Sequence, residues 1–266
     1  MNNSQLSAVN CQLPNRPTFP ARAVITAGMP YGNKDLHFGH IGGVFVHADF
    51  FARFLRDRIG AENVLFVSGT DCYGSPISEA YRKLCDEEGY TGTLHDYVTG
   101  NHETQKKTIE SYLVELNLFA ASAVGAAGVA HDWQSIETFN RLYQNGCLQK
   151  ISTRQFFDPE FGVLLNGRQV VGRCPIEGCR SEKGYADECD LGHQYMPSDL
   201  IAPRSALSGQ TPEMTEVTNW YFKLEEYQPQ LADWVAELES EGNSRAVLTG
   251  TLREFLKPPV IYIKKD

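Results

Sequence analysis

The chain has 266 residues, of which 42% are hydrophobic and 21% charged, and 33 acidic residues outweigh 24 lysines and arginines. This length suffices for one large domain or two modest ones, and no apolar run is long enough to span a bilayer. The net charge of −9 excludes a general attraction to nucleic acid, so any RNA contact needs local basic patches. Seven cysteines, an odd number, argue against a disulfide framework and for a reducing compartment. We therefore expect a cytoplasmic protein with no membrane partner.

Residues 1–20 contain neither an apolar h-region nor a basic n-region, so they predict a flexible extension and not a secretory signal. Residues 22–28 form a compact apolar run that ends in glycine, which is typical of a buried parallel strand. Apolar residues then recur at helical spacing over residues 39–59. Residues 63–71 predict a second buried strand, which also ends in glycine and a polar residue.

Two further helices are predicted over residues 75–88 and 94–118. An alternation of strands and helices predicts an α/β fold with a parallel sheet and right-handed crossovers. Ligands bind such sheets beyond the carboxyl ends of the strands, and residues 27–40 and 69–76 both fall there.

The character of the chain changes near residue 119. Residues 119–130 are small and nearly uncharged, which fits either a buried helix or a flexible hinge. A helix is predicted over 132–148, ended by Gly146, and residues 151–208 have the Gly, Pro and Cys content of a small insertion domain with short β-like runs. A last helix is predicted over 228–241, followed by a closing strand at 258–266.

Two histidines, His37 and His40, flank Gly39 where the first helix begins. A strand that feeds a loop and a helix N-terminus makes an anion site, because free backbone N–H groups and the helix dipole face the ligand. Imidazoles three residues apart can share one side of the first turn and donate to a phosphate chain. Spacing alone favours a second interpretation, a pair of helix-capping or solvent-facing histidines. The position after a buried strand is what favours a phosphate site.

Four ordered motifs lie between residues 24 and 209: VITAGMPYGNKDLHFGH (24–40), GTDCYGSPI (69–77), CPIEGCRSEKGYADECDLGHQY (174–195) and LIAPRSALSG (200–209). Together they resemble the class I aminoacyl-tRNA synthetases and, within them, the methionyl-tRNA synthetase family. The resemblance implies a Rossmann-like nucleotide-binding half-domain at 21–118 and a connective-peptide insertion domain with a zinc knuckle at 119–227. Residues 228–266 would then return toward the catalytic domain.

The resemblance implies that four residues bind ATP, which would enter together with Mg²⁺. His37 and His40 contact the phosphates and stabilise the transition state of adenylate formation, Gly39 lies under the adenine, and Lys34 completes the set.

For the amino acid, the resemblance implies that Asp71 holds the ammonium group while Met29 and Tyr31 line the side-chain pocket. The family usually has leucine at the position of Met29. Soft apolar walls suit the thioether of methionine or a similar amino acid. From the residues alone, Asp71 equally suits a helix N-cap, and Met29 and Tyr31 equally suit a core.

Three cysteines and a histidine have the spacing of a closed tetrahedral zinc site, with two short ligand pairs on either side of a loop; they are Cys174, Cys179, Cys189 and His193. The familiar family pattern has four cysteines with two residues inside each pair. Here both gaps are longer and the last ligand is histidine. A metal-free knuckle kept by packing is the alternative.

Up to Asp266 we find neither the family's aromatic-rich pocket stretch, nor its lysine loop, nor its anticodon-binding domain. We therefore expect an enzyme of methionyl type that activates the amino acid with ATP and transfers it to tRNA, completed by a C-terminal half or a second chain. One alternative is a truncated paralogue that binds an amino acid, nucleotide or partner without catalysis. Another is a nucleotidylyltransferase, which the zinc knuckle and the long insertion disfavour.

Overall fold

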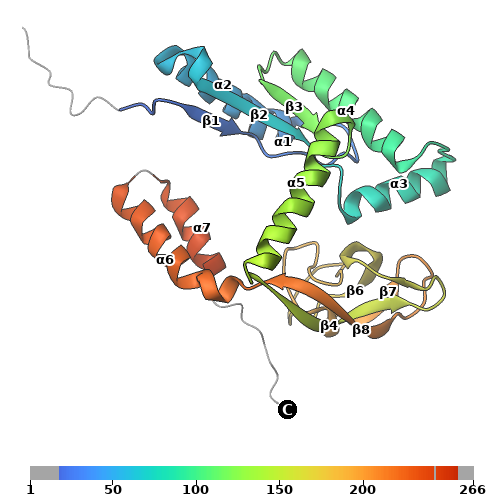
Figure 1. Ribbon diagram of the computed structural model, residues 1–266. Helices are drawn as coiled ribbons and strands as arrows, with labels where there is room; N and C mark the ends of the chain where they lie inside the picture. The colour runs from blue at the N-terminus through green and yellow to red at the C-terminus, as the bar shows by residue number, and fades with distance from the viewer. Residues whose placement is uncertain (1–17, 243, 257–266) are drawn as a thin grey trace, which may run out of the picture. The chain divides into compact units, whose positions relative to one another are not determined.

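The computed structural model describes residues 18–242 and 244–256 (Figure 1). The predicted N-terminal extension lies almost wholly outside the described residues, and the predicted closing strand lies wholly outside them. The chain divides into two compact units, Met1–Asp132 and Trp133–Asp266, with the point of division inside the long helix α5 (Gly125–Gln144). Each unit is described by itself.

The first unit is an α/β fold around a parallel sheet of order β1-β2-β3, as predicted. Its elements in chain order are β1 (Ala23–Thr26), α1 (Phe38–His40), a π-helical turn (Ile41–Phe45), α2 (Val46–Ile59), a 3₁₀ turn (Ala61–Asn63), β2 (Val64–Thr70), α3 (Ser75–Glu88), α4 (Leu94–Ser111) and β3 (Leu118–Ala121).

Residues 18–132 cover only one face of this sheet, so the expectation of fully buried strands is wrong. Ile25 and Phe66 point into the core, where α2 runs along the sheet (Figure 1). On the opposite face Val24, Leu65 and Leu118 are exposed, Val24 by 68%. Successive strand residues point to opposite faces, and apolar side chains occupy both faces here, which is why the runs read as buried.

Residues 119–130 are helical only in their second half, where residues 125–130 begin the mostly exposed start of α5, so the segment is neither one buried helix nor a hinge throughout. Their first part belongs to β3, which pairs with β2, and a turn then leads into α5 at Gly125. Because β3 extends to Ala121, the parallel sheet runs past the predicted boundary at residue 118. The pairing requires glycine at position 69, because a Cβ there would overlap the carbonyl oxygen of Ala120 in the neighbouring strand.

The second unit contains an antiparallel pair, β4 (Leu148–Asp158) with β8 (Glu213–Phe222), extended by β5 (Val163–Leu164). A second pair joins β6 (Val170–Arg173) to β7 (Ile201–Ser205), with 3₁₀ turns at Gly167–Gln169 and Pro197–Asp199. Their shared core consists of Phe156, Leu165, Val170, Ala186 and Leu200. These strands confirm the short β runs that the sequence predicted.

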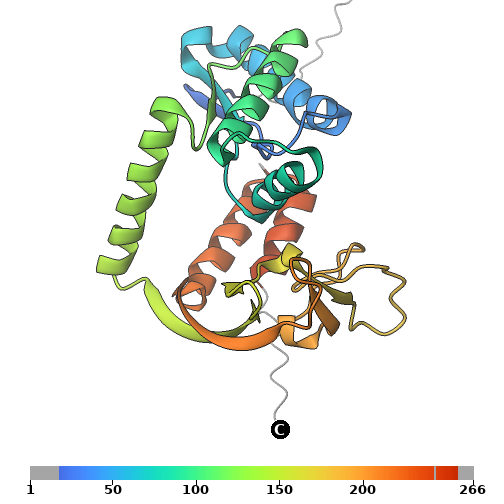
Figure 2. The same ribbon diagram turned by 90° about the vertical axis from the view of Figure 1, so that its right-hand side faces the viewer.

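Two helices complete the second unit and lie side by side in both views (Figures 1 and 2). The first, α6 (Leu224–Glu241), begins before the predicted start at Gln228 and holds Pro229 inside it. The second, α7 (Ala246–Leu256), was not predicted, and Arg253 on it pairs with Glu239 of α6. Within the described ranges, no helix has both the length and the apolar content needed to cross a bilayer.

We predict that Gly69→Ala destabilises the protein by at least about 2 kcal/mol, because the added Cβ would overlap the carbonyl oxygen of Ala120 in the neighbouring strand. Urea denaturation followed by circular dichroism measures the change. The matched control is Gly100→Ala on the exposed side of α4, where the new methyl group meets nothing; it should stabilise by roughly 0.5–1 kcal/mol. Equal effects of the two substitutions would contradict the prediction.

Candidate functional site

The loop after β1 pairs with the end of β2. The backbone N–H of Asp71 donates to the carbonyl of Pro30 at 2.8 Å, and that of Gly32 donates to the carbonyl of Asp71 at 2.7 Å. These two bonds make Tyr31 and Asp71 a parallel bridge beyond the ends of the strands. Two residues of the predicted amino-acid pocket, 40 positions apart in the chain, are thereby neighbours (71 − 31 = 40).

Met29 joins them from the same loop. Its terminal methyl lies 3.2 Å from the point where a Cβ on Gly69 would stand, so its side chain covers the end of β2. Met29 is 48% exposed and Tyr31 is 47% exposed. The alternative in which both belong to a closed core is therefore wrong, and both side chains are accessible at the carboxyl end of the sheet.

Asp71 does not cap the next helix, so that alternative is also wrong. The N-cap of α3 is Gly74. One carboxylate oxygen of Asp71 accepts from the backbone N–H of Tyr73 at 3.0 Å, which fixes the side chain in a tight turn. The other oxygen makes no hydrogen bond to any described residue, so it is available to a cationic group.

The two histidines cap the start of the first helix, as spacing alone favoured. His37 Nδ1 accepts from the backbone N–H of Gly39 at 3.1 Å, and His40 Nδ1 accepts from the backbone N–H of His37 at 3.3 Å. The rings stack with their centroids 3.9 Å apart and their planes tilted by 32°. A side chain on Gly39 would come within 2.9 Å of the His37 ring, so glycine is required for this stacking.

Capping identifies the tautomer of each histidine ring. A backbone N–H can only donate, so each Nδ1 must be an unprotonated acceptor. Each neutral ring then carries its proton on Nε2, the edge turned away from the helix turn. His37 is exposed and His40 half-exposed. The capping and phosphate-binding interpretations therefore describe one arrangement and do not compete.

The electrostatics around His40 favour an anion. Burial, followed by the nearby charges of His37 and Lys34, lowers the pKa of His40 below the usual value for histidine. Lys34 lies in the loop that joins the Tyr31–Asp71 bridge to the histidines, and its side chain is exposed. A phosphate at this point would be attracted by the positive charge of Lys34 and could accept from the Nε2–H of each neutral ring.

The predicted metal ligands converge in the second unit, where the ligand atoms of Cys174, Cys179, Cys189 and His193 all lie within 4.8 Å of one another. Cys179 Sγ is 4.0 Å from Cys189 Sγ, and His193 Nδ1 lies 3.2 to 3.8 Å from the three sulfurs. A tetrahedral zinc with bonds of about 2.3 Å to sulfur and about 2.0 Å to nitrogen places sulfurs about 3.8 Å apart and nitrogen about 3.5 Å from sulfur. The residues present fit a zinc ion.

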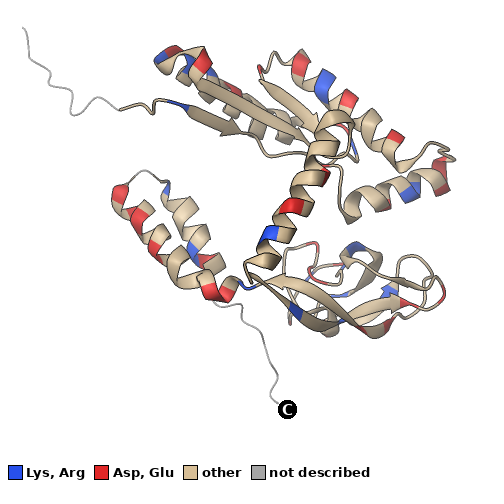
Figure 3. Cartoon of the chain, in the orientation of Figure 1, with Lys and Arg blue, Asp and Glu red and all other residues tan. Residues whose placement is uncertain are grey.

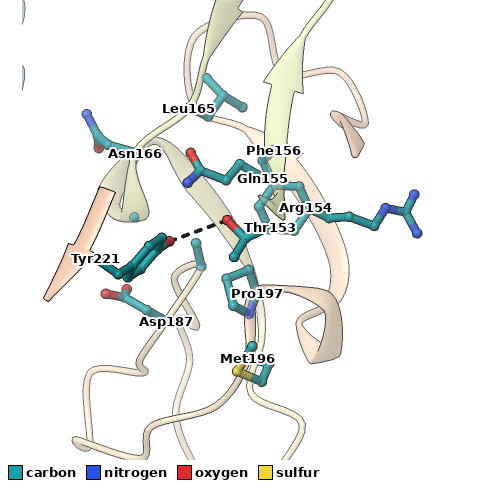
Figure 4. A pocket seen from close by; sticks show the side chains of 12 residues that line it. Thr153, Arg154, Gln155, Phe156, Leu165, Asn166, Asp187, Met196, Pro197 and Tyr221 are labelled. Carbon is teal, nitrogen blue, oxygen red and sulfur yellow. Dashed lines mark hydrogen bonds between the residues drawn. The ribbon is translucent and has the colours of Figure 1, made fainter. Parts of the chain in front are cut away.

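A separate hollow of about 360 Å³ lies in the second unit, walled by β4, β8 and the loops around the cysteine cluster (Figure 4). Thr153 and Tyr221 are hydrogen bonded at 3.5 Å across its wall. None of the residues predicted for the ATP, amino-acid or metal sites lines it. The sequence held no signal for this hollow, because its walls come from segments up to 68 residues apart.

Among the described residues, the view in Figure 3 shows lysines and arginines scattered among acidic residues on both units. In the second unit Arg168 is paired with Glu188 at 2.8 Å and lies over the ring of Tyr185.

A group of polar residues beneath the first unit's site was not predicted from the sequence. Thr70, His102 and Gln105 are buried and hydrogen bonded to one another. Thr70 lies inside a motif that the sequence did single out, but nothing in that motif indicates its partners on α4.

A parallel sheet, a histidine pair at the first helix start and an aspartate at the end of the second strand define the nucleotide-binding half of a class I aminoacyl-tRNA synthetase. The family model described as tRNA synthetases class I (M) matches residues 23–264. The chain belongs to this family, as its four motifs predicted.

Curated relatives carry the name methionine–tRNA ligase. The protein of Cytophaga hutchinsonii is 34% identical over 238 residues, which are 89% of this chain and 32% of the relative. That of Parabacteroides distasonis is 34% identical over 221 residues, 83% of this chain and 30% of the relative. The chain thus spans about a third of the length of the curated relatives it matches.

Solved structures show the same fold at low identity. Mycobacterium tuberculosis methionyl-tRNA synthetase, bound by methionyl-adenylate, superposes with a TM-score of 0.57 at 16% identity, covering 88% of this chain and 39% of that one. Agrobacterium radiobacter LeuRS, in a ternary complex with tRNA and LeuAMS, superposes with a TM-score of 0.53 at 19% identity. The match covers 82% of this chain and 22% of that one.

We predict that Lys34→Met raises the pKa of His40, because it removes one of the charges that repel the imidazolium. The depressed pKa means that the folded state holds this proton less tightly than the unfolded chain does. The contribution to stability is therefore present above about pH 6.5 and is lost as the pH falls toward the folded pKa. NMR titration of the His40 ring signals measures the shift. Lys83→Met on α3 is the control, and an equal midpoint in both variants would contradict the assignment.

Proposed function

We propose that this chain forms the amino-acid-activating part of a methionine–tRNA ligase. In the reaction a carboxylate oxygen of methionine attacks the α-phosphorus of ATP, the bond to the pyrophosphate breaks, and methionyl-adenylate and pyrophosphate result. The aminoacyl group then passes to tRNA. The observation that carries the proposal is the capped histidine pair, which follows the Tyr31–Asp71 bridge at the end of the same loop and keeps its Nε2–H groups free of the capping bonds.

For ATP, we assign His37 and His40 as hydrogen-bond donors to the phosphates, whose negative charge grows on the leaving pyrophosphate during displacement. Because the caps hold both rings by Nδ1, the donors are positioned before ATP binds, and little reorganisation is needed. Gly39 allows the ring stacking and the close approach of the nucleotide. Lys34 supplies a mobile positive charge, and Mg²⁺ enters with ATP as part of the substrate.

For the amino acid, we assign the available carboxylate oxygen of Asp71 to the substrate ammonium group. Met29 and Tyr31, accessible from the same end of the sheet, form an apolar wall for the thioether. Methionine or an amino acid of similar shape and softness fits these three residues.

The remaining parts of the enzyme belong to the other two thirds of the relatives' length. They would lie in a longer polypeptide or in a second chain, which would supply the far wall of the pocket and the charges that face the triphosphate. We place tRNA binding and transfer with that whole assembly, in the cytoplasm.

We further propose that Cys174, Cys179, Cys189 and His193 hold a structural zinc ion. The support is the convergence of four ligand atoms at the separations of a tetrahedral site. The ion would tie the segment around Cys174 to the turn that ends at His193, in a part of the unit with little regular secondary structure.

Elemental analysis should then find about one zinc per chain. Cys179→Ser should abolish tight binding, because it removes one of four ligands, whereas Cys85→Ser, on α3 and outside the cluster, should retain it. Replacement by Co²⁺ gives visible absorption that reports tetrahedral thiolate coordination. Three freely titratable thiols in the cluster, with no bound metal after purification in the presence of zinc, would refute the assignment.

Calorimetry on the chain tests the proposed function. Methionine, a non-hydrolysable ATP analogue and a methionyl sulfamoyl adenosine are titrated in turn. Because the last ligand spans both subsites, it should bind at least about 100-fold more tightly than methionine. Asp71→Asn should weaken its binding roughly 10- to 100-fold through loss of a charge-assisted hydrogen bond. Asp57→Asn, on the exposed side of α2, removes the same charge elsewhere and is the control.

If the unsubstituted chain binds none of the three ligands, the activating function is refuted for it. Equal affinities for all three would identify a binding protein without the transition-state machinery.

A further inference from the structure

Helix α4 holds the loop that follows β1 through a row of polar side chains one turn apart. The hydroxyl of Tyr97 donates to the carbonyl of Asn33 at 2.6 Å, and the amide of Asn101 donates to the carbonyl of Gly32 at 3.1 Å. One turn further, the amide of Gln105 donates to two carbonyls of the same loop. Residues four apart lie on one face of a helix, so a single stripe of α4 faces the loop.

Gln105 is the member of this row that reaches both motifs. Its Nε2 lies 2.8 Å from the carbonyl of Tyr31 and 2.9 Å from that of Lys34, so it binds two points in the middle of the loop at once. Its Oε1 accepts from the hydroxyl of Thr70 at 2.8 Å, and Thr70 directly precedes Asp71. Gln105 and Thr70 are both 0% exposed.

The direction of every hydrogen bond in this network is determined. The two loop carbonyls can only accept, so the NH₂ group of Gln105 faces them and its oxygen faces Thr70. Thr70 therefore donates its proton to Gln105, and its oxygen must accept from Nδ1–H of His102 at 2.8 Å. The His102 ring in turn stacks on Phe119 of β3, with the planes 8° apart. Neither a flipped amide nor another tautomer satisfies all the partners.

A network of this kind controls position more than affinity. Loss of the Gln105 amide would leave two carbonyls of the site loop without this partner, and loss of its oxygen would leave the buried Thr70 hydroxyl without an acceptor. The loop would retain its bonds to Tyr97, Asn101 and the Tyr31–Asp71 bridge. The expected result is a loop that stays folded but no longer has one fixed geometry.

We propose that Gln105 is a positioning residue that sets the spacing between the amino-acid subsite at Tyr31 and Asp71 and the ATP subsite at Lys34, His37 and His40. This inference rests on the proposed function. The inference adds one claim to that function. Without Gln105 each substrate still binds its own subsite, but the linkage between amino acid and phosphate, which spans the two subsites, is no longer held in alignment. Misplacement of about 1 Å costs as much as 100-fold in reactions that depend on alignment.

Gln105→Met, which keeps the size of the side chain and removes its hydrogen bonds, provides the test. We expect the affinity for methionyl sulfamoyl adenosine to fall about tenfold or more, while the affinities for methionine and for the ATP analogue each change less than about threefold. Lys107→Met, the same new side chain on the exposed side of α4, should change none of the three. Thr70→Val should reproduce part of the effect of Gln105→Met. Thr70→Ser, which keeps the hydroxyl, should retain tight binding of methionyl sulfamoyl adenosine.

Amide hydrogen exchange provides a second readout that needs no ligand. In Gln105→Met the amides of Gly32, Gly39 and His40 should exchange faster, while those of the β2 core at Val64 and Phe66 keep their protection. A uniform loss of protection, or an equal loss of affinity for all three ligands, would show a purely structural role and overturn the proposal. Unchanged exchange and an affinity for the adenylate analogue within about threefold of the unsubstituted chain would also overturn it. If the unsubstituted chain binds no ligand, the proposed function fails, and the exchange experiment still decides whether Gln105 anchors the loop.

Discussion

Two backbone hydrogen bonds at the carboxyl end of the sheet support the rest of the site. They join Pro30 and Gly32 to Asp71 and continue the parallel pairing of β1 and β2 into the loops. Irregular backbone at a sheet edge normally populates many conformations, and restricting it to one costs conformational entropy. Here the bridge selects one, and it does so where Met29, Tyr31 and Asp71 must meet. The glycine at position 69 makes this close approach of strands and loops sterically allowed.

The histidine pair shows how a local structural requirement can prepare a chemical one. The first turn of a helix needs acceptors for its free N–H groups, and the Nδ1 atoms of His37 and His40 supply them. The same bonds place the proton of each ring on Nε2. Burial, followed by the nearby charges of His37 and Lys34, lowers the pKa of His40. A capping role and a phosphate-binding role would usually be treated as alternatives. Here the cap provides the donor geometry on which our proposal of phosphate binding rests.

The two units are stabilised in different ways. The first has a continuous apolar core between α2, α4 and one face of the sheet, whereas the second has a smaller core and a segment with little regular structure around its cysteines. Small cores gain the most from a metal crosslink, which is consistent with four ligand atoms gathered in that segment. The unusual gaps between the ligands change the lengths of the intervening turns and still allow the four atoms to meet.

The first two strands and the helices that follow them, the family, and the three cysteines and one histidine that cluster in the second unit were readable from the sequence by itself. Periodicity, turn residues and short motifs are local properties of a chain. The tertiary structure decided the rest. It showed that the strands of the sheet are covered on one face, that residues 119–130 begin with a third strand, and that Asp71 makes a turn and does not cap a helix. It also paired Gln105 with the carbonyl of Tyr31, 74 residues away. Nothing in a local pattern specifies such a partner, since a buried amide is defined only by the groups that folding brings around it.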